Sequence, residues 1–177
     1  MDLKTVLVAA LVLFTNYAWT QMTPAPGSEI KKLDYFVGSW AVEGTIGQGP
    51  WGNGGKFSSN DRAEWMPGKF FVEIHSDFKM PAETGGDGMA IAFMGYDTDA
   101  NLYTYDEFNS QGRREISKGI VRGDTWTWTS TQNYGGQEVK QKMTMKVLSP
   151  SSYSLKFEVS VDGTTWMTFL DAKATKK

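Results

Sequence analysis

From about residue 39 to the end of the chain, hydrophobic and polar side chains alternate with a period of two in most segments. Between residues 69 and 80, for example, Phe70, Val72 and Ile74 fall on one face, whereas Glu73 and His75 fall on the other. A period of two is typical of β-strands whose two faces meet different environments. Clusters of Gly, Asp, Asn, Ser and Pro separate the alternating runs and indicate tight turns. The pattern predicts nine or ten strands, over about residues 39–46, 57–66, 69–80, 88–96, 101–109, 113–121, 124–132, 137–148, 152–161 and 165–174.

One short helix is expected before the first strand. Ser28 can cap it, and one helical face carries Ile30, Leu33, Phe36 and Val37. No later segment has the pattern of a crossover helix, so neighbouring strands should be antiparallel. A meander of this many strands has two exposed edges, which closure into a barrel removes. The sequence therefore predicts an all-β fold, an antiparallel up-and-down barrel with the short N-terminal helix closing one end.

The first twenty residues have the features of a secretory signal peptide. Lys4 precedes an apolar run of nine residues over 6–14, which is shorter than the roughly 20 residues that span a bilayer. Small residues at Ala18 and Thr20 favour cleavage before Gln21, and cleavage after Ala18 is the alternative. An uncleaved anchor or a buried apolar element is the other interpretation. With cleavage, no membrane span remains and the protein is periplasmic or secreted. The expected organisation is a signal peptide, a linker and a barrel domain, over residues 1–20, 21–28 and 29–177.

Composition narrows the class of function. The chain has 177 residues with 18 basic and 20 acidic side chains, so it lacks the basic surface that nucleic acid or anionic lipid requires. The absence of cysteine excludes disulfides, thiolate metal sites and cysteine nucleophiles. The one histidine, His75, excludes sites that need two imidazoles. We expect an aromatic-rich globular domain with no nucleic-acid partner, no metal and no cofactor, and its oligomeric state is left open.

The segment that joins the expected helix to the first strand contains a Gly-Ser-Trp motif. Gly38 allows the chain to turn under the barrel, and Trp40 can plug its closed end. The chain resembles the lipocalin or calycin architecture in this arrangement. It resembles more closely the small secreted bacterial proteins of the domain of unknown function 1579 family. The matching pieces, which cover most of the chain after residue 33, are Gly38–Trp40, Gly95–Asp97 with Tyr103, Gly119 with Gly123–Trp128, Ser149–Pro150 with Tyr153, and Glu158–Trp166.

This resemblance implies a lipocalin-like barrel with room for an internal cavity and no assigned reaction. The chain departs from lipocalins because no arginine follows Arg122 to pack over the first-strand tryptophan, and Lys173 is a candidate substitute. A related class of barrels binds haem through a histidine late in the chain. No histidine follows His75 here, which argues against haem.

The glycine-rich segment over residues 47–56 resembles a phosphate-binding loop but fails its pattern. The required glycine and Ser/Thr positions hold Pro50 and Phe57. A mobile loop is one interpretation, and a lid over the open barrel end with Trp51 as its apolar tip is the other. Similarly, the acidic segment over residues 97–101 lacks the glycine and glutamate of a calcium loop and is interpreted as a hairpin turn.

Three groups of residues are candidates for ligand contact in the barrel lumen, each with a structural alternative. Glu73 and His75 share a strand face and could tune each other for acid–base chemistry, or simply face solvent. Tyrosine side chains combine apolar walls with polar tips, which suits an amphipathic ligand. The remaining candidates, which could equally be packed core, are Tyr103, Tyr105, Glu107, Trp126 and Trp128.

Three classes of function remain open at this stage. The favoured one is a binding protein that holds a small apolar or amphipathic molecule in its lumen. The second is a solidly packed barrel that acts as a structural or interaction module. The third is an enzyme that uses Glu73 and His75, for which no nucleophile–base motif is present.

Overall fold

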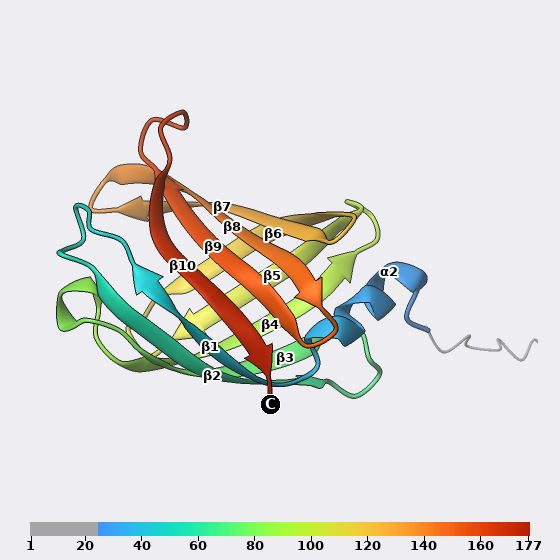
Figure 1. Ribbon diagram of the computed structural model, residues 1–177. Coiled ribbons are helices and arrows are strands. Elements are labelled where there is room, and N and C mark those ends of the chain that lie inside the picture. Colours follow the sequence, from blue (N-terminus) through green and yellow to red (C-terminus); the bar gives the residue numbers. More distant parts are fainter. Residues whose placement is uncertain (1–24) are drawn as a thin grey trace, which may run out of the picture.

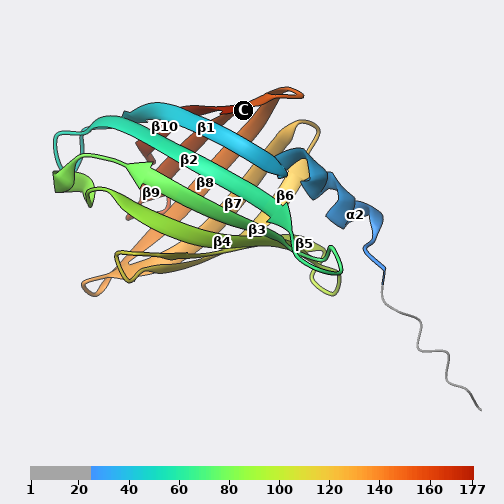
Figure 2. The same cartoon turned by 90° about the horizontal axis from the view of Figure 1, so that it is seen from below.

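The computed structural model describes residues 25–177 as a closed barrel of ten antiparallel strands (Figures 1 and 2). Each strand pairs with its neighbours in sequence, and the first pairs with the last, so no edge is left unpaired. The expected signal peptide and residues 21–24 lie outside the described residues. The strands are β1 (Gly38–Ile46), β2 (Gly55–Trp65), β3 (Val72–Lys79), β4 (Gly88–Asp97), β5 (Leu102–Asn109), β6 (Arg114–Arg122), β7 (Thr125–Tyr134), β8 (Gln137–Ser149), β9 (Ser152–Ser160) and β10 (Met167–Lys176).

The predicted barrel is confirmed, and ten strands occur close to their expected positions. The largest difference is at β3, which begins at Val72 because Lys69 adopts a left-handed conformation with φ 58° in the turn after β2. The helical segment consists of α2 (Ser28–Lys31) and η1 (Lys32–Phe36). Gly27, and not Ser28, occupies the N-cap position of α2, so the expected serine cap is wrong. A further short turn, η2 (Ala82–Thr84), lies between β3 and β4.

The helical segment lies at one end of the barrel, shown at the right of Figure 1. Its apolar side chains belong to the hydrophobic core of the barrel. Leu33 and Phe36 are buried there together with Trp40 at the start of β1. The indole Nε1 of Trp40 donates a hydrogen bond of 2.7 Å to the carbonyl of Phe36, which fixes the tryptophan against the helical turn. Burial of each such side chain contributes about 1.5–3 kcal/mol. The predicted plug at the closed end is therefore present.

A cation does pack over the first-strand tryptophan, but it is not Lys173. The ammonium of Lys176 lies 5.2 Å from the ring centroid of Trp40, and these two residues are cross-strand partners between β10 and β1. Lys173 is exposed on the opposite face of β10. The prediction of Lys173 is wrong because Lys173 pairs with the exposed Glu43, whereas Lys176 shares the inward phase of Ala172 and Ala174.

Candidate functional site

The barrel interior changes character from the helix end to the loop end. Near the helix, the inward side chains are packed: Val72, Met94 and Trp128 are each at most 1% exposed. Toward the opposite loops, the inner wall mixes buried side chains, such as Ile46, Ser59 and Gln141, with half-buried polar ones. We call its half-buried polar lining the lumen cup, which comprises Asp61, Ser76, Tyr105, Glu107, Glu115 and Ser130.

Strand register places these side chains inside the barrel. Directly paired residues of neighbouring strands point to the same face. Asp61 pairs with Trp40, whose indole fills the closed end, and Glu107 pairs with the buried Ala92. Glu115 in turn pairs with Glu107 across β5 and β6, so two carboxyl groups stand side by side on the inner wall.

Serine and tyrosine hydroxyl groups donate hydrogen bonds to the carboxyl groups of the lumen cup. The hydroxyl of Tyr105 donates to Oε2 of Glu107 at 3.0 Å. The hydroxyl of Ser117 donates to Oε1 of Glu115 at 2.9 Å, and the hydroxyl of Ser59 donates to Oδ1 of Asp61. None of these donors carries a positive charge, so the contacts solvate the carboxyl groups without neutralising them.

The environment of the lumen cup favours the neutral form of its acids. Burial raises the pKa of Asp61, Glu107 and Glu115 above the usual carboxyl range, and the charge of Glu115 adds to the effect on Glu107. Hydrogen bonds from serine, tyrosine and Asn109 oppose the shifts, as does the charge of Lys177 at Asp61. Burial likewise raises the pKa of Tyr105, so its hydroxyl stays a donor.

A hydrogen-bonded chain continues from Glu115 across the inner wall to β8. Oγ of Ser130 lies 3.1 Å from Oε1 of Glu115 and 2.9 Å from Oε1 of Gln141, whose amide donates to the hydroxyl of Tyr134 at 2.9 Å. One serine hydroxyl has one proton and can donate to only one of these two oxygens. A protonated Glu115 that donates to Ser130 would let Ser130 donate to Gln141 and satisfy both contacts.

Aromatic rings form the floor beneath the lumen cup. Trp126 and Trp128 stack with their centroids 6.1 Å apart, and Tyr105 lies 5.7 Å from Trp128. Gly119 makes room for this floor, since a Cβ there would lie 2.3 Å from Cε3 of Trp128. Tyr103 packs on Trp126 at 4.7 Å, and its hydroxyl donates to the carboxylate of Glu29 at 2.7 Å.

The structure brings some of the candidate residues together and separates others. Tyr105 and Glu107 line the lumen cup. Tyr103, Trp126 and Trp128 face inward too, but they are packed into the floor. Trp51 lies in the β1–β2 loop at the loop end, where its ring packs against Phe169 at 5.2 Å and its Nε1 donates to the carbonyl of Gly47.

Glu73 and His75 lie on the outer wall, so the interpretation of these two residues as a lumen site is wrong and the solvent-facing alternative holds. Between them on β3, Ile74 faces inward. Nε2 of His75 is 2.6 Å from Oε1 of Glu73, and the side chains are 57% and 36% exposed.

Sequence reasoning missed Asp61, Ser76, Glu115 and Ser130, which complete the lumen cup. A signal was present: Asp61 shares its strand phase with the inward Phe57 and Ala63, and Glu115 shares its phase with Ser117 and Gly119. A carboxyl group on the apolar or small-residue phase of a strand indicates a polar position inside the barrel. The inward phase of these two strands was not known from the sequence.

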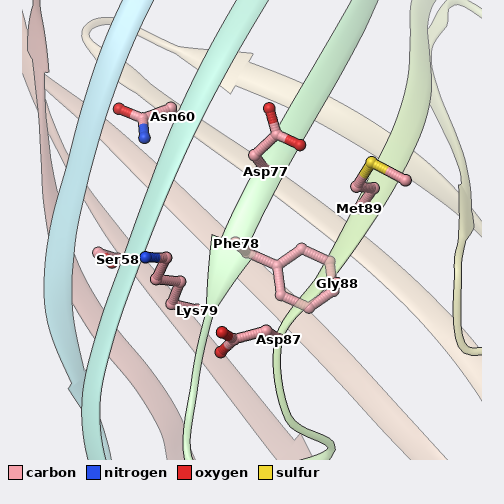
Figure 3. A pocket seen from close by; sticks show the side chains of 8 residues that line it. All are labelled: Ser58, Asn60, Asp77, Phe78, Lys79, Asp87, Gly88 and Met89. Atoms are coloured by element: carbon pink, nitrogen blue, oxygen red, sulfur yellow. The ribbon is translucent and has the colours of Figure 1, made fainter.

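The outer wall carries two open grooves near the loop end. One, of about 480 Å³, lies over β2, β3 and β4 (Figure 3). The other, of about 690 Å³, lies over β1, β2 and the β3–β4 loop. Neither is lined by a candidate residue from the sequence. The side chains shown in Figure 3 are Ser58, Asn60, Asp77, Phe78, Lys79, Asp87, Gly88 and Met89.

Among residues 25–177, no three His, Cys, Asp or Glu side chains are grouped closely enough to hold a metal ion. Within the same residues, no helix combines the length and the apolar character needed to cross a membrane.

Comparison with known proteins supports the fold. The crystal structure of Rv2717c from M. tuberculosis superposes with a TM-score of 0.58 over 85% of this chain and 98% of that chain. The two sequences are 11% identical, so the likeness concerns the fold alone. No protein-family model and no curated protein matches the chain, and the resemblance to the domain of unknown function 1579 family stays a prediction.

Proposed function

We propose that this protein is an exported binding protein that holds a small amphipathic molecule in its barrel lumen. One observation carries the proposal, namely that the polar side chains of the lumen cup are half-buried on the inner wall above a packed aromatic floor. A cavity with an apolar floor and a few convergent polar groups is the usual form of a small-molecule site.

Stability alone does not favour such an interior. Burial of a carboxyl group among protein atoms is unfavourable unless it is paired or protonated, and apolar side chains would fill the same space favourably. Three carboxyl groups with raised pKa values therefore support a functional use of the lumen cup.

The interaction-module alternative has support from the outer wall. The large apolar side chains of β4, β5 and β6 are exposed there, and Oδ1 of Asp106 is buried among them without a hydrogen-bond partner in the described residues. Arg114 and Lys118 lie on the same face as Asp106, so in a symmetric dimer these cations of a second copy of the chain could bind the unpaired Oδ1. The exposed apolar residues of this outer patch are Met89, Ile91, Phe108, Ile116 and Ile120.

The enzyme alternative has less support. The Glu73–His75 pair is exposed, and neither residue lines a described groove.

Blocking the lumen cup tests the proposed function. Ser130→Leu adds bulk to the inner wall, whereas Thr131→Leu adds the same side chain to the outer face of the same strand. Fluorescence of N-phenyl-1-naphthylamine, a neutral apolar probe, reports binding. We expect Ser130→Leu to weaken probe binding at least about tenfold and Thr131→Leu to leave it within about twofold. Equal binding by both variants would contradict lumen binding.

A further inference from the structure

We propose that the outer wall over β4, β5 and β6 is the contact surface of a symmetric homodimer, in which β5 of each copy lies against β6 of the other. Two equivalent sets of ion pairs join the copies, each between Asp106 of one copy and the partner's Arg114 and Lys118. This inference does not rest on lumen binding, because the outer wall and the interior are opposite faces of the same strands.

Large exposed apolar side chains are concentrated on this part of the barrel. Met89, Ile91, Phe108, Ile116 and Ile120 have exposed fractions between 40% and 61%. Ile91 and Phe108 are direct cross-strand partners, so the group is continuous across β4 and β5. Single apolar side chains are normal on the surface of a monomer, whereas a continuous group bordered by charges is typical of a protein contact surface.

A carboxylate without a partner lies within this apolar group. Asp106 pairs across the sheet with Phe93 on β4 and with Ile116 on β6, so apolar side chains flank it on both sides. Its Oδ1 is buried and has no hydrogen-bond partner among the described residues. Asp106 as a whole is half-buried, so its side chain can be approached from the outer side. Partial removal of an unpaired carboxylate from water is unfavourable, and a bound cation relieves that cost.

Two cations on the same face lack an acidic partner. Arg114 and Lys118 are exposed, and neither forms an ion pair with a carboxylate of the described residues. The guanidinium of Arg114 instead lies 5.6 Å from the ring centroid of Phe108. The face therefore carries an anion and cations that are not paired with one another in the single chain. Such a face is complementary in charge to a second copy of itself.

Strand register defines the symmetry that pairs these groups. A two-fold axis parallel to the strands, between β5 and β6, lays β5 of one copy over β6 of the other. This rotation keeps each residue's position along the strand, so Asp106 faces the partner's Ile116, its own cross-strand position. The partner's Arg114 and Lys118 then lie on either side, two residues away along β6. Packed sheets are about 10 Å apart, a distance that an aspartate and a long basic side chain span together.

The size of the face sets the expected strength of the dimer. The four strands from β4 to β7 are together about 19 Å wide, and nine residues of a strand are about 30 Å long. Two such faces bury roughly 1,100 Å² in total, which is near the lower limit for a specific complex. We therefore expect a weak dimer that dissociates at low micromolar concentration.

Sedimentation velocity of the chain from residue 21 onward tests whether the dimer exists. Between about 1 and 200 µM, we expect the average mass to rise from that of the monomer toward twice that value. A chain that stays monomeric throughout this range would overturn the proposal. Monomeric protein that binds phosphatidylcholine vesicles would likewise overturn it and assign the apolar surface to lipid.

Charge reversal tests whether these residues form the contact. Asp106→Lys, and separately the double variant Arg114→Glu with Lys118→Glu, place like charges opposite each other in a homodimer. We expect each to weaken self-association at least about tenfold. An equimolar mixture of the two should form a heterodimer, because every reversed charge then faces an opposite one. Native mass spectrometry distinguishes the heterodimer from both homodimers by mass.

Glu43→Lys makes the same change in charge as Asp106→Lys at an exposed position on β1 and should leave dimerisation within about twofold of the unaltered protein. A thermal melt confirms that the variants fold, and Asp106→Asn replaces Asp106→Lys if the lysine variant does not. Undiminished self-association of the folded variants, or the absence of a heterodimer from the mixture, would overturn the proposed contact.

Discussion

The carboxyl groups of the lumen cup should make the protein less stable as the pH rises from the acidic range to neutrality. Asp61, Glu107 and Glu115 have pKa values raised by burial in the folded state. Above the unfolded carboxyl pKa, the unfolded chain loses these protons first, so the folded state binds more protons. The free energy of unfolding then falls with increasing pH until the raised pKa values are passed.

The size of this effect follows from the number of groups. Each carboxyl group that is ionised only in the unfolded state lowers the free energy of unfolding by about 1.4 kcal/mol per pH unit. With three such groups, the upper limit of the slope is about 4 kcal/mol per pH unit, and the partial exposure of the lumen cup reduces it. Below the ordinary carboxyl pKa the slope reverses. In the folded state Lys32 lowers the pKa of Glu29, and hydrogen bonds from backbone amides lower the pKa of Asp162. Protonation of these two carboxylates as the pH falls therefore lowers the free energy of unfolding.

Denaturant unfolding followed by tryptophan fluorescence between pH 4 and 8 measures this dependence. We expect maximal stability near the ordinary carboxyl pKa, about 4–4.5, and a decline toward neutral pH. Glu115→Gln should make the decline shallower and raise stability at pH 7, whereas the exposed Glu43→Gln should leave the curve unchanged. A free energy of unfolding that stays constant or rises from pH 5 to 7.5 in the unaltered protein would refute the reasoning.

Two further predictions concern the closed half of the barrel. Lys176→Met removes the cation over Trp40 and should lower the free energy of unfolding by about 0.5–1 kcal/mol. Lys173→Met, on the outer face, should have no measurable effect. Equal effects of the two substitutions would contradict the assignment of Lys176 as the cation over Trp40. Gly119→Ala places a Cβ 2.3 Å from Cε3 of Trp128 and should lower the free energy of unfolding by about 1–3 kcal/mol in the same denaturation assay. An unchanged denaturation midpoint would show that Trp128 can shift without loss of stability.

The barrel was predictable from the sequence because its determinants are local. Period-two alternation in β7 and β9, and turn residues such as Gly123 and Gly163 with positive φ, mark strands and hairpins without knowledge of the rest of the fold. The largest discrepancy, at the start of β3, arose because the alternating pattern continues through Lys69 although the backbone turns there.

The candidate site was only partly predictable because it depends on which face of each strand turns inward. Tyr105 and Glu107 were found through the aromatic character of β5, yet Asp61 and Glu115 were missed since a lone carboxyl group on a strand is usually solvent-exposed. Cross-strand register determines which face of each strand turns inward. It pairs Asp61 with the buried Trp40, and Glu115 with Glu107, and this information is spread over strands distant in sequence.

Native mass spectrometry of the chain from residue 21 onward, purified gently from a bacterial periplasm, tests lumen binding most directly. The account predicts a reproducible adduct of a small molecule, on the order of a few hundred daltons for a cavity site, that is lost on denaturation and absent from Ser130→Leu but present on Thr131→Leu. A clean protein mass, unchanged after incubation with n-octylamine, octanoic acid or 1-octanol, would contradict it.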